Sequence, residues 1–203
     1  LPARGGAPLD GVDLSWRPLL TADGSSTLVH PVHGEACHSR AGAWQQAQER
    51  YARACRVSDF AGETFRLLDV GTGVGLNLAA ALEALERAGA GFLTVSLERD
   101  AGVIEAGLAL EQPAEVVRWL APVRAALQKA LASPKTRSED VPLGRGRLRL
   151  LLGDARDTLR SLPESARFDA VFLDPFSPRV EPDLWSPEFL REIARRMAPG
   201  SRL

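Results

Sequence analysis

Residues 67–78 read LLDVGTGVGLNL, and this stretch decides the fold of the chain. An apolar run over residues 65–70 comes first, as a central parallel strand covered on both faces requires. Apolar residues then recur at helical spacing, so a helix is expected to begin at about Leu76. Between them, Gly71, Gly73 and Gly75 let the chain turn tightly and approach a ligand closely, because glycine has no Cβ. The first amides of the helix then face whatever occupies the turn.

The spacing of these glycines narrows the choice of ligand. A dinucleotide fingerprint requires G-x-G-x-x-G, but Leu76 stands where its third glycine would be. Counted from Asp69, the pattern is instead D-x-G-x-G-x-G. This pattern resembles the nucleoside-binding turn of class I S-adenosylmethionine-dependent methyltransferases, which lies against the ribose and the amino-acid part of the cofactor.

Composition and charge exclude several classes of protein. A chain of 203 residues with 45% hydrophobic content is long enough for one domain with a real core. The net charge of −1 provides no overall basic field for a nucleic-acid partner. No apolar run approaches the roughly 20 residues of a membrane span, and no signal peptide is visible, so a cytoplasmic location without membrane attachment is expected.

The histidines and cysteines do not form a familiar metal motif. Cys37 and Cys55 show no recognisable spacing, so a reduced intracellular protein is the default. His30, His33 and His38 lie near Cys37, but their separations do not match a zinc pattern, and no metal is expected. The alternatives for this segment are a polar loop or a loop that folds over the glycine turn.

The remaining pattern predicts a doubly wound α/β fold. Residues 1–60 are expected to form an irregular arm, short β pieces and a helix capped by Ser39 that packs over the cofactor site, and residues 61–203 the core. The predicted core strands are residues 65–70, 92–97, 147–152 and 168–174. The predicted helices begin at Leu76, span residues 101–132 and run from Pro187 to about Met197, and residues 133–146 are expected to be a loop. The order β-α-β-α-β-α-β-α indicates a parallel sheet, truncated at Leu203 where a fifth strand should begin, and the sequence is expected to be a fragment of a longer protein.

Two acidic residues follow predicted strands at positions suited to a nucleoside. Glu98 ends the second core strand, where a carboxylate can accept hydrogen bonds from both hydroxyls of a ribose. Asp154 follows the third core strand and can accept from an adenine amino group. The alternative for an acid at a strand end is an ordinary solvated side chain.

Several stretches together resemble one methyltransferase family. They are Gly34-Glu35, His38-Ser39 and Gly42, residues 68–77, Gly153-Asp154-Ala155, and residues 168–178 (FDAVFLDPFSP) with residues 182–187 (PDLWSP). The chain resembles, over roughly residues 21–203, the family that completes 5-methylaminomethyl-2-thiouridine at the tRNA wobble position (the MnmC/MnmD type). The glycine turn is shared by all class I methyltransferases, whereas the Asp-Pro-Phe-Ser-Pro run with its downstream Leu-Trp is much more specific.

The resemblance implies a set of site residues. The cofactor S-adenosyl-L-methionine is expected to contact Asp69, Gly71, Gly73, Gly75, Asn77, Glu98, Asp154 and Ala155. Glu35, His38, Ser39, Pro175 and Phe176 are expected to bind the substrate, and Asp174 to be catalytic. The implied partners are tRNA, through its wobble uridine, and a separate or fused flavin-dependent oxidase. Bifunctional members carry such an oxidase domain, and nothing in this sequence corresponds to it.

The implied reaction places a demand on Asp174. A primary amine such as that of 5-aminomethyluridine has a pKa of about 10.4, near that of lysine, and its protonated form cannot attack a methyl group. The Asp174-Pro175 turn is expected at the carboxyl end of a central strand, where open α/β sheets bind ligands. There its carboxylate can accept amine protons and orient the lone pair, and Phe176 can stack on a flipped-out base.

Alternatives to this function remain open at the level of sequence. A small-molecule methyltransferase or an aminopropyl transferase shares the nucleoside site. A non-enzymatic nucleoside-binding module is the third interpretation. For Asp174 itself, the alternative to a catalytic role is a helix cap or a turn former.

Overall fold

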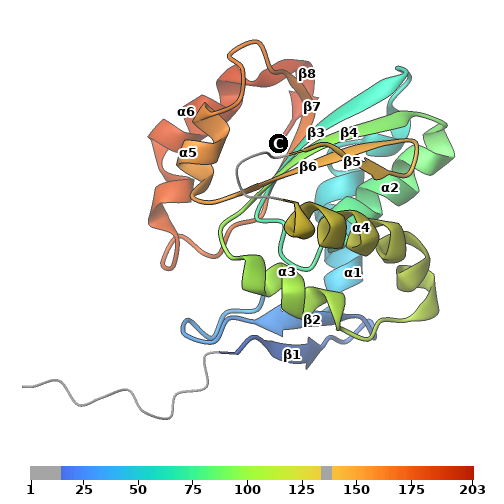
Figure 1. Ribbon diagram of the computed structural model, residues 1–203, viewed down its shortest axis with the longest axis vertical. Helices are drawn as coiled ribbons and strands as arrows, with labels where there is room; N and C mark the ends of the chain where they lie inside the picture. Colours follow the sequence, from blue (N-terminus) through green and yellow to red (C-terminus); the bar gives the residue numbers. More distant parts are fainter. Residues whose placement is uncertain (1–14, 134–138) are drawn as a thin grey trace, which may run out of the picture.

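A six-stranded sheet forms the centre of the protein, which we describe from a computed structural model covering residues 15–133 and 139–203 (Figure 1). The order of the strands is β5-β6-β4-β3-β7-β8. Five of them are parallel: β3 (Thr64–Val70), β4 (Gly91–Glu98), β6 (Gly146–Leu152), β7 (Phe168–Leu173) and β8 (Met197–Arg202). The edge strand β5 (Val141–Leu143) runs antiparallel to β6. The doubly wound α/β fold expected from the sequence is therefore confirmed.

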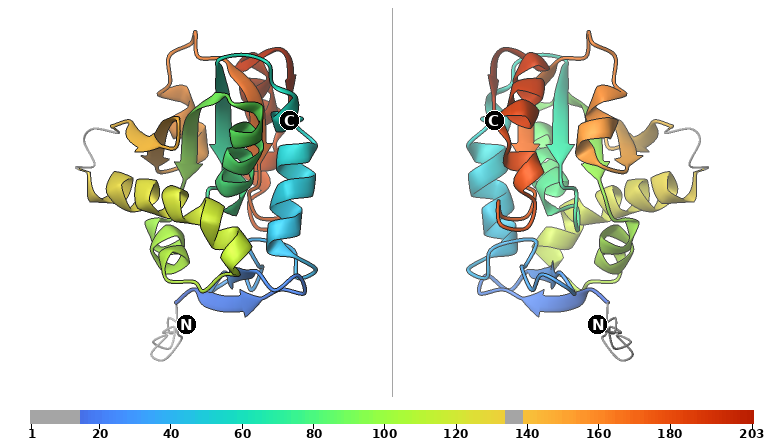
Figure 2. Two further views of the ribbon diagram at one scale, coloured as in Figure 1. Left: turned by 90° about the vertical axis from the view of Figure 1, so that its right-hand side faces the viewer. Right: turned by 90° about the vertical axis from the view of Figure 1, so that its left-hand side faces the viewer.

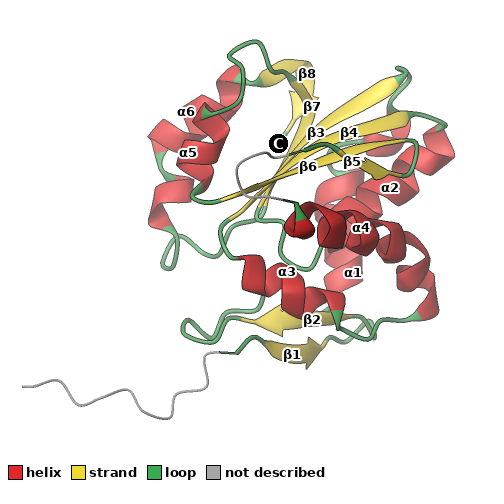
Figure 3. Ribbon diagram, in the orientation of Figure 1, coloured by secondary structure: helices red, strands yellow, loops and turns green. Residues whose placement is uncertain are grey.

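Helices cover both faces of the sheet (Figure 2). On one face lie α2 (Leu76–Ala88) and α4 (Ala114–Ala132), and on the other α5 (Ala155–Arg160) and α6 (Pro187–Arg195). Figure 3 shows the same arrangement by type of element, with the strands between the two helical layers. Strand β3 contributes to both cores, because successive side chains of a strand point to opposite faces. Phe65 and Leu67 join the core under α2 and α4, whereas Leu68 and Val70 join the core under α5 and α6. Burial on both faces accounts for the nearly continuous apolar run in this strand.

A smaller unit precedes the sheet in the chain. Strands β1 (Arg17–Leu20) and β2 (Ser26–Val29) form an antiparallel hairpin, followed by the single helical turn α1 (Ala43–Gln46) and the π-helix η1 (Ala47–Arg53). Helix η1 packs against α2, while β2 contacts α3 (Ala101–Leu108). Of the irregular arm expected at the N-terminus, residues 1–14 lie outside the part that the structure describes. A 3-10 turn η2 (Val57–Asp59) leads into the sheet, and a second one, η3 (Pro182–Trp185), precedes α6.

Three expectations about element boundaries were wrong. Residues 101–132 form two helices, because the chain breaks before Pro113 and the Gln112 side chain binds both the amide and the carbonyl of Ser26. Part of the expected loop 133–146 is strand β5, paired through a tight turn to β6. The N-cap of α1 is Gly42 and not Ser39, whose hydroxyl accepts a hydrogen bond from the Ala41 amide.

The fifth parallel strand, expected to begin at Leu203, lies earlier in the chain. Helix α6 ends at Arg195, and Met197–Arg202 runs along β7 as strand β8. The sequence MAPGSR conceals this strand because Pro199 and Gly200 are poor strand formers, and the pairing is accordingly irregular between Phe168 and Ala170. Strand β7 is therefore an interior strand and not the exposed edge that a sheet ending before Leu203 would have.

Candidate active site

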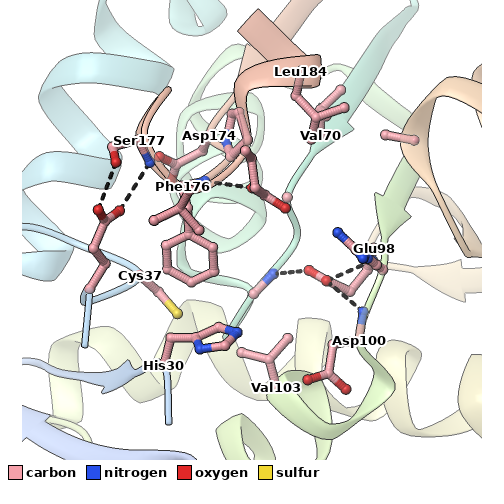
Figure 4. A pocket seen from close by; sticks show the side chains of 18 of the residues that line it. His30, Cys37, Val70, Glu98, Asp100, Val103, Asp174, Phe176, Ser177 and Leu184 are labelled. Atoms are coloured by element: carbon pink, nitrogen blue, oxygen red, sulfur yellow. Dashed lines mark hydrogen bonds between the residues drawn. The ribbon is translucent and has the colours of Figure 1, made fainter. Parts of the chain in front are cut away.

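A cavity of about 770 Å³ opens at the carboxyl ends of the parallel strands. This volume is within the range of small-molecule sites, and the position is where open α/β sheets bind ligands. The walls come from the turn after β3, the ends of β4, β6 and β7, and the segment around β2 (Figure 4). The expected site residues that line the cavity are Glu35, His38, Ser39, Gly71, Gly73, Glu98, Asp154, Ala155, Asp174, Pro175 and Phe176.

The glycine turn forms the floor on one side. Gly71, Gly73 and Gly75 all adopt left-handed φ values, of 85°, 52° and 84°. A Cβ built on Gly73 would meet nothing within 4 Å, so open space lies above it. A Cβ on Gly75 would instead lie 3.1–3.2 Å from Val123 and Leu127 of α4. Gly73 thus serves the approach of a ligand, and Gly75 serves the packing of α4.

Glu98 lies beside this turn at the end of β4. Its Oε2 accepts a hydrogen bond from the Gly73 amide at 2.8 Å, and its Oε1 accepts from the amides of Arg99 and Asp100 at 2.7 and 3.0 Å. Burial raises the pKa of this carboxyl, and the three amide donors oppose that shift. A carboxylate oxygen offers two lone pairs, so Oε2 can still accept from a ligand hydroxyl.

In this structure, the hydrogen bonds of Asp154 cap helix α5 and hold the Arg156 side chain. Its Oδ1 accepts from the Arg156 amide as the N-cap of α5, and the Arg156 guanidinium binds both carboxylate oxygens at 2.7–2.9 Å. The hydrogen bond from Arg156 lowers the pKa of Asp154 to about 2, so this carboxyl is ionised at neutral pH. Ala155 lies next to it on the cavity wall.

Three of the expected cofactor residues do not line the cavity but lie behind its wall: Asp69, Gly75 and Asn77. Asp69 is fully buried, and its Oδ2 accepts from the Ser96 hydroxyl at 3.0 Å. Burial raises the pKa of Asp69 to about 7. Asn77 is also buried, and its side-chain amide donates to Asp174 Oδ2 at 2.8 Å. The structure places Asp69 as support for the strand end and Asn77 as support for Asp174.

Asp174 occupies the bottom of the cavity at the end of β7. In addition to Asn77, the hydroxyl of Tyr51 lies within hydrogen-bonding reach of the carboxylate. Burial raises the pKa of Asp174 to about 7, and these two donors oppose that shift. The sequence analysis did not assign Tyr51 to the site. It reaches Asp174 from η1, and π-helical turns of this kind are frequent at functional sites.

The Pro175–Ser177 loop is held rigidly around Asp174. The Phe176 amide donates to Glu181 at 2.8 Å, and its carbonyl accepts from the indole of Trp185 at 2.8 Å. Ser177 donates through its amide and hydroxyl to Glu35, at 3.0 and 2.6 Å, as Figure 4 shows. The Leu-Trp motif that the sequence analysis noted therefore fixes Phe176, and the expected substrate residue Glu35 ties the N-terminal segment to this loop.

His38 and Ser39 both line the cavity, and each has a hydrogen-bond partner in the protein. His38 is buried, shares a 2.9 Å hydrogen bond with the Thr27 hydroxyl, and has its pKa lowered to about 4 by burial, so its ring is neutral. The Ser39 amide donates to Gln46 at 2.6 Å.

Within residues 15–133 and 139–203, no three His, Cys, Asp or Glu side chains are grouped to hold a metal ion.

The residues that line the cavity fit S-adenosylmethionine. The open space above Gly73 admits close contact with the backbone, and Glu98 retains acceptor capacity for a hydroxyl. Asp174 and Glu98 both carry negative charge toward the cavity when ionised, which suits a ligand with a sulfonium and an ammonium group.

Among the helices that the structure describes, none is long and apolar enough to cross a membrane.

Comparisons with known proteins show the family of the chain. A family model described as S-adenosyl-L-methionine-dependent methyltransferase matches residues 120–203. The chain is 34% identical over 183 residues to the tRNA 5-methylaminomethyl-2-thiouridine biosynthesis bifunctional protein MnmC of Pseudomonas paraeruginosa, covering 85% of this chain and 27% of that protein. It is also 34% identical to the MnmC protein of Aromatoleum aromaticum, covering 97% of this chain and 30% of the relative.

A solved structure extends the likeness to three dimensions. The crystal structure of MNMC2 from Aquifex aeolicus matches with a TM-score of 0.71 and 32% identity, over 93% of this chain and 58% of that one. The chain spans less than a third of the length of the two curated relatives named above. On these grounds, the chain belongs to the S-adenosylmethionine-dependent methyltransferases of the MnmC type.

Proposed function

We propose that this protein methylates the aminomethyl nitrogen of 5-aminomethyluridine, or its 2-thio form, at the wobble position of tRNA. The observation that carries the proposal is Asp174, a carboxylate at the bottom of the cavity with two supporting donors and a pKa raised to about 7. The names of the relatives, which refer to 5-methylaminomethyl-2-thiouridine in tRNA, support this choice of product. S-adenosylmethionine, when bound, supplies an electrophilic methyl group.

The raised pKa of Asp174 suits the removal of a proton from an ammonium group. An amine with a pKa of about 10.4 loses its proton to a carboxylate of pKa 7 at a cost of roughly 4–5 kcal/mol, against roughly 9 kcal/mol for an ordinary aspartate. Asp174 accepts the proton and holds the nitrogen with its lone pair toward the methyl group. As the new N–C bond forms, the S–C bond breaks and its electron pair stays on sulfur. The methylated nitrogen then carries two protons, and the one it loses passes to water, because Asp174 already holds the first proton.

We further propose roles for the residues around this centre. Gly71, Gly73 and Glu98 hold the cofactor on the β3–β4 side, with Asp154 and Ala155 at the end of β6. Pro175 and Phe176 lie on the acceptor side with Ser39 and His38, while Glu35, Asn77, Asp69 and Gly75 keep these walls in place. The division into an N-terminal segment to about residue 60 that covers the site and a core from residue 61 fits the segments that line the cavity.

The rim of the cavity offers contacts for the phosphate groups of a nucleic acid. Four arginines line a depression of about 500 Å³ together with three acids: Arg156 and Arg160 of α5, Arg191 and Arg195 of α6, and Asp183, Glu188 and Glu192. Each arginine is ion-paired with an acidic side chain, so a phosphate would have to compete with these pairs. Arg156 and Asp183 border both this depression and the cavity, so the two adjoin. Arginine binds phosphate oxygens with its fork of donors. We infer that tRNA crosses this arginine depression, and that a flavin-dependent oxidase acts on the wobble uridine before the methyl transfer.

Methylation of a defined tRNA tests the proposal. The full protein, incubated with S-adenosylmethionine and tRNA bearing 5-aminomethyl-2-thiouridine, should produce the methylaminomethyl nucleoside. Methylation of small amines in place of the tRNA would favour a small-molecule methyltransferase, and transfer of an aminopropyl group would favour an aminopropyl transferase. Cofactor binding without any transfer would favour a nucleoside-binding module.

A further inference from the structure

Three aromatic side chains from different segments of the chain meet at the cavity, and the ring of a fourth, His33, lies 4.3 Å from one of them, His30. Trp16 precedes β1, His30 follows β2, and Phe176 lies two residues beyond Asp174. The ring centroids of Trp16 and Phe176 are 6.3 Å apart, and the two planes are within 17° of parallel. The His30 ring stands almost perpendicular to Phe176 at 5.3 Å and steeply inclined to Trp16 at 4.9 Å. We call Trp16, His30 and Phe176 the aromatic cluster.

Each ring of the aromatic cluster is held in place by its surroundings. The Trp16 indole donates to Asp100 at 3.1 Å, directly beside the start of α3. The backbone of Phe176 is fixed on both sides by Glu181 and Trp185. Figure 4 shows His30 and Phe176 side by side, facing the cavity. Rings that are already ordered lose little entropy when a flat ligand stacks on them.

The contacts of His30 decide which of its ring nitrogens carries the proton. Its Nδ1 accepts hydrogen bonds from the amides of Val32 and His33, at 3.1 and 3.2 Å. Because an amide can only donate, Nδ1 must be unprotonated, and the proton of the neutral ring is on Nε2. Burial also lowers the pKa of His30, which keeps the ring neutral at pH 7. His30 therefore offers a fixed N–H donor at Nε2, on a ring that lines the cavity.

From this arrangement, we propose that the aromatic cluster is the subsite for the acceptor ring, a pyrimidine stacked on the outer, cavity-facing side of the Trp16–Phe176 pair, with an exocyclic carbonyl bound by the Nε2–H of His30. The 6.3 Å between the two centroids is too short for a base to lie between these rings. The proposal rests on the proposed function and specifies how the same site selects its substrate. Aromatic side chains bind unstacked bases by their faces, and hydrogen bonds read their edges. A substituent on the ring can then reach Asp174, which is two residues from Phe176.

This subsite distinguishes a keto pyrimidine from other amines. A flexible alkylamine has no ring to stack and no carbonyl to accept from His30. A cytosine presents an amino group at the position where uracil presents its 4-carbonyl, so a fixed donor on the protein meets a donor on the base. Trp16 and His30 were not assigned to the substrate by the sequence pattern, because no motif relates them to the glycine turn or to each other.

Four variants of the full protein test the subsite. Trp16→Leu removes one aromatic ring of the Trp16–Phe176 pair, and Trp16→Phe retains an aromatic ring there. His30→Phe keeps an aromatic ring but removes the donor, and His30→Gln restores an N–H donor without the ring. For each variant, we would measure thermal unfolding, the Kd for S-adenosylmethionine, and kcat and KM for tRNA and for the free nucleoside 5-aminomethyluridine.

If the subsite exists, the variants should change the KM for the acceptor and not the Kd for the cofactor. Trp16→Leu should raise the KM for the nucleoside by roughly five- to a hundredfold, the range for loss of one stacking contact. His30→Phe should raise it by roughly two- to tenfold, the range for loss of one neutral hydrogen bond. Both should leave the Kd for S-adenosylmethionine unchanged. Trp16→Phe should stay within about threefold of the wild type, and His30→Gln should recover part of the loss seen in His30→Phe. Two further nucleosides, one lacking the 4-oxygen and one lacking the 2-oxygen, identify the carbonyl that His30 contacts. The nucleoside without that oxygen should have a higher KM than the parent nucleoside with the wild type, but a similar KM with His30→Phe.

Other outcomes contradict the subsite in separate ways. An unchanged acceptor KM in both Trp16→Leu and His30→Phe, with an active wild type, would overturn the subsite and leave the proposed function standing. A weaker Kd for S-adenosylmethionine in these variants would show that the cluster covers the cofactor. A wild-type protein that binds S-adenosylmethionine but methylates neither tRNA nor nucleoside would contradict the proposed function and the subsite together.

Discussion

A Cβ on Gly71 would lie 2.6 Å from the backbone carbonyl oxygen of Asp174. The turn after β3 and the turn after β7 therefore touch each other, because β3 and β7 are neighbouring parallel strands that end together. The Asp174 amide also donates to the Val70 carbonyl at 2.9 Å. The residue that begins the glycine turn thus sets the position of the proposed catalytic carboxylate.

The first prediction concerns Gly71→Ala. Gly71 has a φ of 85°. Gly89, at the end of α2, has a φ of 71°, but a Cβ there would meet nothing within 4 Å, so Gly89→Ala is a matched control. Both changes should cost roughly 1–2 kcal/mol for a left-handed alanine, and Gly71→Ala should cost more, because its Cβ would also clash with the Asp174 carbonyl oxygen. Only Gly71→Ala should also lower turnover, because it displaces the Asp174 backbone. Thermal unfolding and single-turnover methylation check this, and equal activity of the two variants would contradict it.

The second prediction concerns Glu98→Ala. If Glu98 accepts ribose hydroxyls while holding the Gly73 amide, its loss should weaken S-adenosylmethionine binding by about 1.5–3 kcal/mol, the range for hydrogen bonds to a charged group. Glu181→Ala is a useful control, because Glu181 also accepts from a backbone amide of the cavity wall but on the acceptor side. Calorimetry with both variants is the measurement. Full cofactor affinity in Glu98→Ala would remove Glu98 from the cofactor site.

The sequence predicted the parts of this site that depend on short motifs. The glycine turn, Glu98 and Asp174 each follow a buried strand, and the carboxyl ends of parallel strands meet at one edge of the sheet. Those positions could be assigned from the sequence alone, because strand, turn and helix each leave a local pattern.

The rest depends on contacts between distant segments. Tyr51 reaches Asp174 from the π-helix η1, and the sequence pattern of a π-helix is not distinct from that of an α-helix. Trp16 joins the site through the fold of the β1–β2 hairpin. Strand β8 was missed because its pairing with β7 outweighs the low strand propensity of Pro199 and Gly200.

The third prediction concerns pH. Asp174 must be ionised to take a proton, and its pKa in the folded protein is raised to about 7, so kcat/KM should fall as the pH drops below about 7. Tyr51→Phe removes a donor that favours the ionised form. The pKa of Asp174 should then rise further, and the acidic limb of the profile should move to higher pH. A profile unchanged in Tyr51→Phe would show that Tyr51 does not act on Asp174.

The fourth prediction concerns the arginine depression. Arg160→Ser combined with Arg191→Ser should raise the KM for tRNA and make its logarithmic dependence on salt shallower by about two, if each arginine contacts one phosphate. The KM for the free nucleoside should not change. Arg87→Ser is the control, because Arg87 is similarly exposed and paired with Glu83 but lies on α2, away from the depression. An equal effect of the control would exclude a specific phosphate contact.

The most direct test of the central claim is mass spectrometry of wobble nucleosides after single-turnover reactions of the wild type, Asp174→Asn and Asp174→Ala. Full-length protein, S-adenosylmethionine with a deuterated methyl group and tRNA bearing 5-aminomethyl-2-thiouridine would be the reactants. We expect one labelled methyl on the aminomethyl nitrogen with the wild type, and a rate lower by about a hundredfold or more with both variants, at nearly normal cofactor affinity. No labelled nucleoside from the wild type, or a near-normal rate with Asp174→Ala, would contradict the account.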